Sequence, residues 1–157
     1  MSAPPGYRPS PANMPRHQAT PAAQPYEPKK LTPEQSIAPG KFRSGERLRS
    51  MYTQGMRISR MLPETRLVGL TLLGYANFQT GLIHARWQPT PGQLADATGL
   101  AEDRVRVHLE VLRQRGWMVC RTLAEGPRAG DTVQQLTVPA LVLEQMRARF
   151  HENRQRN

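Results

Sequence analysis

The stretch LADATGLAEDRV, Leu94 to Val105, predicts two short helices that meet at a three-residue turn. Thr90 can cap the first helix, and Pro91 suits its first position. Gly99 can adopt the positive φ with which a chain commonly leaves a helix. Such a corner fixes how two helices cross, so it limits the possible folds more than any other part of this chain.

The second helix of the corner has one apolar stripe. Val105, Leu109 and Leu112 recur at i, i+4 and i+7, so we expect them to face the core. Gly116 ends the helix. The opposite face carries Asp103, Arg106, Val107, Glu110 and Gln114. The pattern therefore predicts a helix that is buried on one side and directs a mostly polar face outward.

The flanking segments add a helix, a short strand and a hairpin. Pro63 precedes ETRLVGLTLLGYANF, whose apolar residues lie on nearly every side, so we expect a core helix. IHARWQ, residues 83–88, alternates as a short strand does. WMVCRTL and TVQQLTV, residues 117–123 and 132–138, are β-rich and enclose AEGPRAGD, which suits a hairpin loop.

Composition sets the expected domain limits. A chain of 157 residues with 38% hydrophobic content can bury one modest core. Ten of the fifteen prolines fall within residues 1–40, which predicts a disordered Pro-rich arm. Residues 41–61 interleave arginines with apolar residues and are interpreted as a partly helical basic linker; an arm along a phosphate backbone and a helix packed on the domain are the alternatives. The ordered domain is expected at 62–138, and a last helix with a basic tail at 139–157.

Charge indicates the class of partner. The chain has 22 Lys and Arg against 12 Asp and Glu, a formal +10, which favours nucleic acid or an acidic membrane surface. Most cations are arginines, whose planar guanidinium binds phosphate or guanine through two hydrogen bonds, although a GC-rich genome gives the same bias. The N-terminus lacks a signal peptide's apolar core and no eighteen apolar residues run together, so a cytoplasmic, nucleoid-associated protein with no membrane partner is expected.

Other chemistry has little support in the sequence. The single cysteine, Cys120, excludes an internal disulfide and a multi-cysteine zinc site. His84, His108 and His151 lie far apart, so no metal site is expected, and His108 is interpreted as a packed core residue. A glycine-rich phosphate loop, a serine elbow and a paired-carboxylate motif are all missing, so neither an enzyme nor a cofactor is expected.

The predicted order of elements is helix, short strand, helix, three-residue turn, helix and hairpin, centred on TPGQLADATGLAEDRVRVHLEVLRQRGWM. This order and this stretch resemble the winged helix-turn-helix domain of bacterial DNA-binding proteins. The resemblance covers roughly residues 64–138. RLVGLTLLGYANFQTG is also similar to the first helix of actinobacterial plasmid or phage replication and regulatory proteins. The fold class implied is mainly α with a small β-hairpin.

The resemblance implies that the second helix of the corner enters the major groove of double-stranded DNA. Family contacts fall on the exposed early part of this helix, on the start of the preceding helix and on the wing. The matching residues here are, in that order, Glu102, Asp103, Arg104, Arg106 and Val107; Thr90 and Gln93; Arg121 and Arg128.

Two departures from the family pattern lie at the reading tip. Ala101 stands where the family commonly has a Ser or Thr cap, which weakens the helix start by about 0.5 to 2 kcal/mol. Glu102 and Asp103 follow it; they suit the positive end of the helix dipole and can accept a hydrogen bond from cytosine N4. An unpaired carboxylate near phosphate opposes binding, so these acids weaken the prediction of direct base reading.

Three functions remain open at this point. The first is sequence-specific DNA binding by a transcriptional regulator or by an accessory factor of plasmid or phage replication. The second is a protein interaction module, suggested by Glu102, Asp103 and Glu110 on one helix. The third is a non-specific architectural protein held by arginine–phosphate contacts. Only about 20 residues follow Val138, so no small-molecule effector is expected.

The C-terminal helix carries an apolar stripe after the expected domain is complete. Its side chains could pack against the domain or against a second copy of the chain. We expect a homodimer through Leu143, Met146 and Phe150.

Overall fold

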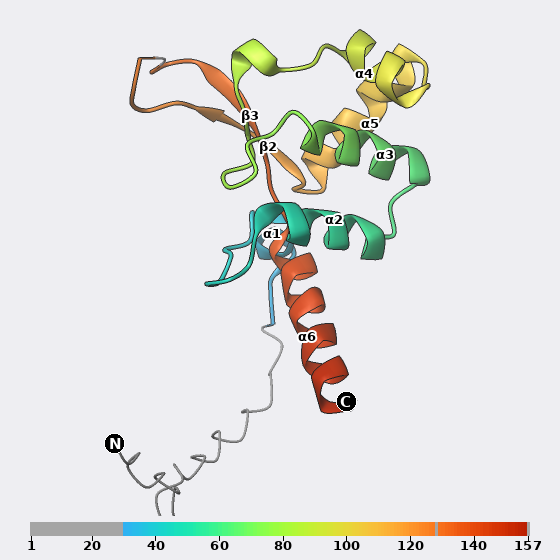
Figure 1. Ribbon diagram of the computed structural model, residues 1–157, viewed down its shortest axis with the longest axis vertical. Coiled ribbons are helices and arrows are strands. Elements are labelled where there is room, and N and C mark those ends of the chain that lie inside the picture. The colour runs from blue at the N-terminus through green and yellow to red at the C-terminus, as the bar shows by residue number, and fades with distance from the viewer. Residues whose placement is uncertain (1–29, 128, 157) are drawn as a thin grey trace, which may run out of the picture.

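The computed structural model describes residues 30–127 and 129–156, and within them helices and one small antiparallel sheet form the fold (Figure 1). The expected mainly helical class with a hairpin is confirmed at this level. In chain order the elements are α1 (Pro33–Ile37), α2 (Leu48–Ile58), α3 (Pro63–Leu73), β1 (Leu82–Ile83), the 3-10 turn η2 (Ala85–Trp87), α4 (Pro91–Thr98), α5 (Glu102–Gln114), β2 (Met118–Thr122), β3 (Thr132–Leu136) and α6 (Ala140–Arg156). None of the described helices is both long and apolar enough to cross a bilayer.

Helix α3 lies at the centre and packs against α2, α4 and α5. Pro63 occupies its first turn, as expected. Val68 and Leu72 are completely buried, whereas Leu67 and Leu70 are 42% and 38% exposed. The expectation of a core helix is therefore confirmed, although its neighbours cover only one of its faces and leave apolar residues of the other face exposed.

The sheet has the strand order β1-β3-β2. β2 and β3 form the expected hairpin, with Met118 opposite Leu136 and Thr122 opposite Thr132. β1 has only two residues, both paired with β3. The strand expected over 83–88 is wrong beyond Ile83, because the chain turns there and the Trp87 N–H donates to the His84 carbonyl at 2.8 Å.

Helix α2 is part of the core, which corrects the expected linker over 41–61. Its inward face consists of four buried side chains, Leu48, Met51, Tyr52 and Met56. The Tyr52 ring meets the buried Trp117 ring edge to face, with centroids 5.4 Å apart. Tyr52 is fully buried, and this desolvation raises the pKa of its phenol. The core therefore begins at α2 and does not begin at residue 62.

Residues 30–40 are ordered, whereas the sequence predicted disorder over all of 1–40; the first part of that arm, 1–29, lies outside the described residues. Thr32 caps α1 in a reciprocal pair with Gln35. The following segment runs beside the start of α6, where the Gly40 N–H donates to the Val138 carbonyl at 2.8 Å. Backbone pairing, which composition does not report, holds this segment in place.

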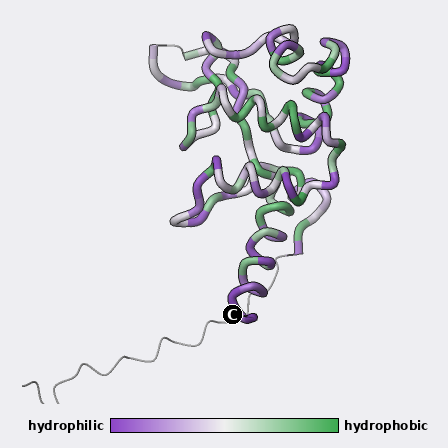
Figure 2. The backbone as a smooth tube through the Cα atoms, turned by 45° about the vertical axis from the view of Figure 1, so that its right-hand side comes forward, coloured by the Kyte–Doolittle hydropathy of each residue, from purple (hydrophilic) through white to green (hydrophobic). Residues whose placement is uncertain are grey.

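Helix α6 packs on α1 and α2 within the same chain. Leu143 and Met146 are 0% and 3% exposed, while Phe150 is 50% exposed. Figure 2 shows hydrophobic residues in the first part of this helix and hydrophilic ones at its end. The expected dimer stripe is therefore wrong for Leu143 and Met146, because their own chain already covers them.

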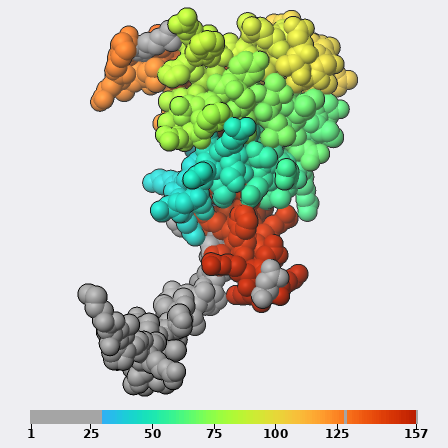
Figure 3. Space-filling view, in the orientation of Figure 1, coloured from blue at the N-terminus to red at the C-terminus, as the bar shows by residue number. Residues whose placement is uncertain are grey.

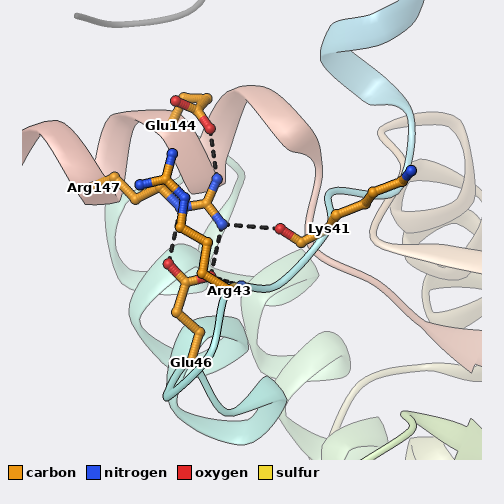
Figure 4. Close-up of polar contacts among 5 residues, drawn as sticks. All are labelled: Lys41, Arg43, Glu46, Glu144 and Arg147. Carbon is orange, nitrogen blue, oxygen red and sulfur yellow. Dashed lines mark hydrogen bonds and ion pairs between the residues drawn. The ribbon is translucent and has the colours of Figure 1, made fainter. Parts of the chain in front are cut away.

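A buried ion pair joins α6 to the segment before α2 (Figure 4). The Arg147 guanidinium donates to both carboxylate oxygens of Glu46, at 2.9 and 2.7 Å, to Glu144 at 2.6 Å and to the Lys41 carbonyl at 2.9 Å. Only 9% of the Arg147 side chain is exposed. The hydrogen bond from Arg147 holds the pKa of Glu46 below its ordinary value. These bonds satisfy a cation that would otherwise be costly to bury.

Candidate nucleic-acid interface

The corner between α4 and α5 has the predicted geometry. Thr90 and Gln93 cap α4 reciprocally: the Gln93 N–H donates to Thr90 Oγ1 at 3.2 Å, and the Thr90 N–H donates to Gln93 Oε1 at 2.9 Å. Gly99 has φ 71° and ends the helix in the left-handed conformation. Leu94 is 1% exposed and fixes α4 to the core. Thr90 and Gln93 are therefore first of all capping residues, and both are exposed.

Helix α5 is anchored along one side only. Val105 and Leu112 are fully buried, and Leu109 is partly buried against the core. His108 is buried and its Nδ1 lies 2.9 Å from Thr65 Oγ1 of α3, so the interpretation of this histidine as a packed residue is confirmed. Ala101 provides no side-chain cap, as the sequence indicated. The helix is held rigidly while its outer face stays accessible.

The outer face of α5 carries compensated charge. Arg106 donates to Glu102 one turn earlier, with 64% and 49% of these side chains exposed. Arg113 pairs with Glu110 at 2.8 Å, and this hydrogen bond lowers the pKa of Glu110. Arg106 and Arg113 can therefore contact DNA only after they leave their carboxylates.

The remaining candidates on α5 are Asp103, Arg104 and Val107. Asp103 Oδ1 accepts a hydrogen bond from the Arg104 N–H at 2.8 Å, which satisfies a free donor at the helix start. The Arg104 guanidinium has no carboxylate within 4 Å in the described part of the chain. Val107 is 58% exposed. The exposed early turns therefore offer an apolar contact and one uncompensated arginine.

The hairpin carries the two remaining predicted contacts. Arg121 lies in β2 opposite Val133 of β3 and is exposed. Arg128 lies outside the described residues. The loop closes through hydrogen bonds between Leu123 and residues 130–131, so the two strands hold Arg121 in a defined register.

Sequence reasoning missed two exposed residues in η2. Trp87 is 64% exposed, and the Arg86 guanidinium lies 5.6 Å from the centroid of its ring. η2 packs beside β3 and leads into the Thr90 cap. The signal available in the sequence was a tryptophan between a strand and a helix cap, but this tryptophan was interpreted as part of the strand.

These segments gather at one end of the molecule. Figure 1 shows the hairpin loop, η2, α4 and the start of α5 at the upper end of the long axis, with α6 at the lower end. α4 and α5 pack directly against each other and against α3. The structure thus brings the predicted residues of α4, α5 and β2 to the same end of the fold, together with Arg86 and Trp87.

Metal-ligating side chains and the single cysteine were the other groups considered in the described ranges. These ranges contain no cluster of three or more His, Cys, Asp or Glu that could hold a metal ion. Cys120 is exposed on β2 as a free thiol. Comparisons of the chain with protein-family models, with curated proteins and with solved structures gave no match. The function must therefore be inferred from the geometry of the surface itself.

Proposed function

We propose that this chain is a winged helix-turn-helix protein that binds double-stranded DNA in a sequence-dependent manner, as a transcriptional regulator or an accessory factor of plasmid or phage replication. The observation that carries the proposal is the position of α5, which is fixed on one side while its early turns are exposed at the same end of the long axis as the hairpin loop. The major groove is about 12 Å wide and admits a helix with its side chains. In this proposal β2 and β3 form the wing.

The ion pair on α5 is compatible with base reading on energetic grounds. Exposed ion pairs contribute about 0 to 1 kcal/mol, whereas a bidentate arginine–guanine contact discriminates by about 1 to 3 kcal/mol. Arg106 therefore gains more from a base than it loses from Glu102. The released carboxylate can accept a hydrogen bond from cytosine N4. Arg104 and Arg121 are assigned to the phosphate backbone.

Arg106→Ala and Arg121→Ala are expected to differ on specific and random DNA. The duplex is one selected from genomic fragments that the protein retains, and affinity is measured over a range of salt concentrations. Arg106→Ala should lose about 1 to 3 kcal/mol on the selected duplex and little on random sequence. Arg121→Ala should weaken both equally and lower the salt slope by about one unit. Arg113→Ala, at the far end of α5, is the matched control and should change neither.

Two other results would favour the rival functions. Equal losses on both duplexes from Arg106→Ala would indicate an architectural protein that contacts only phosphate. If the parent protein has no measurable affinity for either duplex, the face is better explained as a protein interaction surface. Its compensated charge and the exposed Val107 would then contact a polypeptide.

A further inference from the structure

A second strongly charged surface lies on α2, apart from the α5 and hairpin face. The outward half of this helix forms a shallow depression of about 390 Å³. Its lining consists of Arg47, Arg49, Ser50, Thr53, Gln54 and Arg57, which we call the α2 face. In Figure 3 the atoms of this part of the chain reach the surface between the central helices and α6.

The α2 face carries uncompensated positive charge. The sequence contains no Asp or Glu from Arg47 to Pro63, but it contains four arginines there. In the part of the chain that the structure describes, Arg47, Arg49 and Arg57 have no carboxylate within 4 Å. On α5, by contrast, two of the exposed arginines, Arg106 and Arg113, are paired with Glu102 and Glu110. The α2 face is therefore suited to a polyanion without prior release of an ion pair.

The stability of α2 explains the place of Arg57 in its last turn, but it does not explain the places of Arg47 and Arg49. Arg47 and Arg49 lie at the start of the helix, where the dipole disfavours cations. Arg49 is nevertheless held in place, because its guanidinium lies 4.8 Å from the centroid of the exposed Phe78 ring. A guanidinium that is already oriented loses less side-chain entropy when it binds an anion.

The pattern along the helix fits a phosphate backbone. Arg47, Ser50, Gln54 and Arg57 recur at i, i+3, i+7 and i+10, so they form one stripe about 15 Å long. Each strand of a duplex carries one phosphate per about 3.4 Å of axis, so the stripe spans about four steps. Hydroxyl and amide groups between the arginines can donate to phosphate oxygens, as in many protein–DNA contacts.

We propose that the α2 face is a second phosphate-binding surface, through which one chain contacts a second segment of duplex DNA. This inference rests on the function proposed above, in which α5 and the hairpin are the first DNA-binding surface. α3 packs between α2 and the corner formed by α4 and α5 (Figure 1). The two surfaces therefore belong to different layers of the fold. A chain that uses both surfaces connects two DNA segments.

A bridging assay with a charge-matched control tests this inference. One short duplex is fixed on beads, and the capture of a labelled second duplex is measured with the full chain. The α2 variant is R47Q/R49Q/R57Q, and the control, K30Q/R154Q/R156Q, removes the same charge from exposed residues elsewhere. The α2 variant should capture at least about tenfold less duplex than the parent, and the salt slope measured for capture of the second duplex should fall by about two to three units. The control should stay close to the parent.

Each other outcome has a defined meaning. Capture and salt slope equal to those of the control would overturn the inference, and bridging would then be assigned to a dimer. If the α2 variant loses binding to phosphatidylglycerol vesicles but still captures duplex, the inference is overturned in favour of an anionic membrane. If the triple variant does not fold, Arg57→Gln alone must lower the slope by about one unit. Failure of the proposed function looks different, because R104Q/R121Q would then leave duplex binding intact while the α2 variant abolishes it.

Discussion

A chain shortened to residues 63–157 is expected to be largely unfolded at room temperature. The shortened chain lacks α2, whose four buried side chains each contribute about 1.5 to 3 kcal/mol. Their sum, about 6 to 12 kcal/mol, is comparable to the whole stability of a domain of this size. The removal also exposes Trp117, which packs on Tyr52, and Gly69, which lies against Met56. Far-UV circular dichroism during a thermal melt measures the effect.

A chain that begins at Lys30 is the matched control for this truncation. It keeps every described contact, including the pairing of residues 38–40 with 138–140, so its melting temperature should equal that of the full chain. Cooperative melting of the 63–157 chain at the same temperature would show that α2 is dispensable. The ordered domain would then begin near residue 62, as the sequence alone suggested.

Replacement of Arg147 by Met should lower the free energy of unfolding by about 3 to 5 kcal/mol near neutral pH. The methionine fills much of the space but leaves Glu46 and Glu144 without their shared cation, and only 17% and 14% of those side chains are exposed. Urea unfolding measures the difference. Arg149→Met, an exposed neighbour on the same helix, should change stability by less than about 0.5 kcal/mol.

The effect of Arg147→Met should depend on pH. Since the pKa of Glu46 is lowered in the folded state, its contribution is fully present above the ordinary pKa of a glutamate and is lost as the pH falls through the lowered value. The gap between parent and variant should therefore narrow below about pH 4. A gap that stays constant from about pH 7 to about pH 3 would show that packing by Arg147, not its charge, provides the stability.

The elements that the sequence predicted well are those specified by local chemistry. Thr90, Pro91 and Gly99 define the start and end of α4 through caps that involve only neighbouring residues. The stripe of Val105 and Leu112 on α5 needs only helical period. The loop between β2 and β3 was marked by glycine, proline and charge. In each case the interactions that decide the structure lie within a few residues.

The errors concern segments whose packing depends on distant residues. Leu48, Met51, Tyr52 and Met56 already have the helical spacing of a buried face, but the arginines between them suggested a linker. The stripe on α6 was recognised, yet the sequence does not state whether α2 or a second copy covers it. The bond from Arg147 to Glu46 joins residues 101 positions apart, so no local pattern indicates it.

The sequence predicted which elements form the candidate site, but it did not predict how their side chains pair. The Glu102–Arg106 pair has the i, i+4 spacing that favours ion pairing on a helix, so it was readable from the sequence but was not considered. Arg86 and Trp87 were missed, because a two-residue strand followed by a 3-10 turn resembles a longer strand. The difference in charge compensation between α5 and α2 depends on side-chain pairing, which the structure supplies.

Mapping the DNA contacts by chemical shift tests the central claim most directly. Nitrogen-15-labelled full chain is titrated with one equivalent of the selected duplex, and the backbone amide signals are followed. We predict the largest changes at the start of α4, in the first two turns of α5 and in β2 near Arg121, with the last turns of α6 unchanged. Changes confined to α2 or α6, with α5 and the hairpin silent, would contradict the proposal that α5 and the hairpin bind DNA.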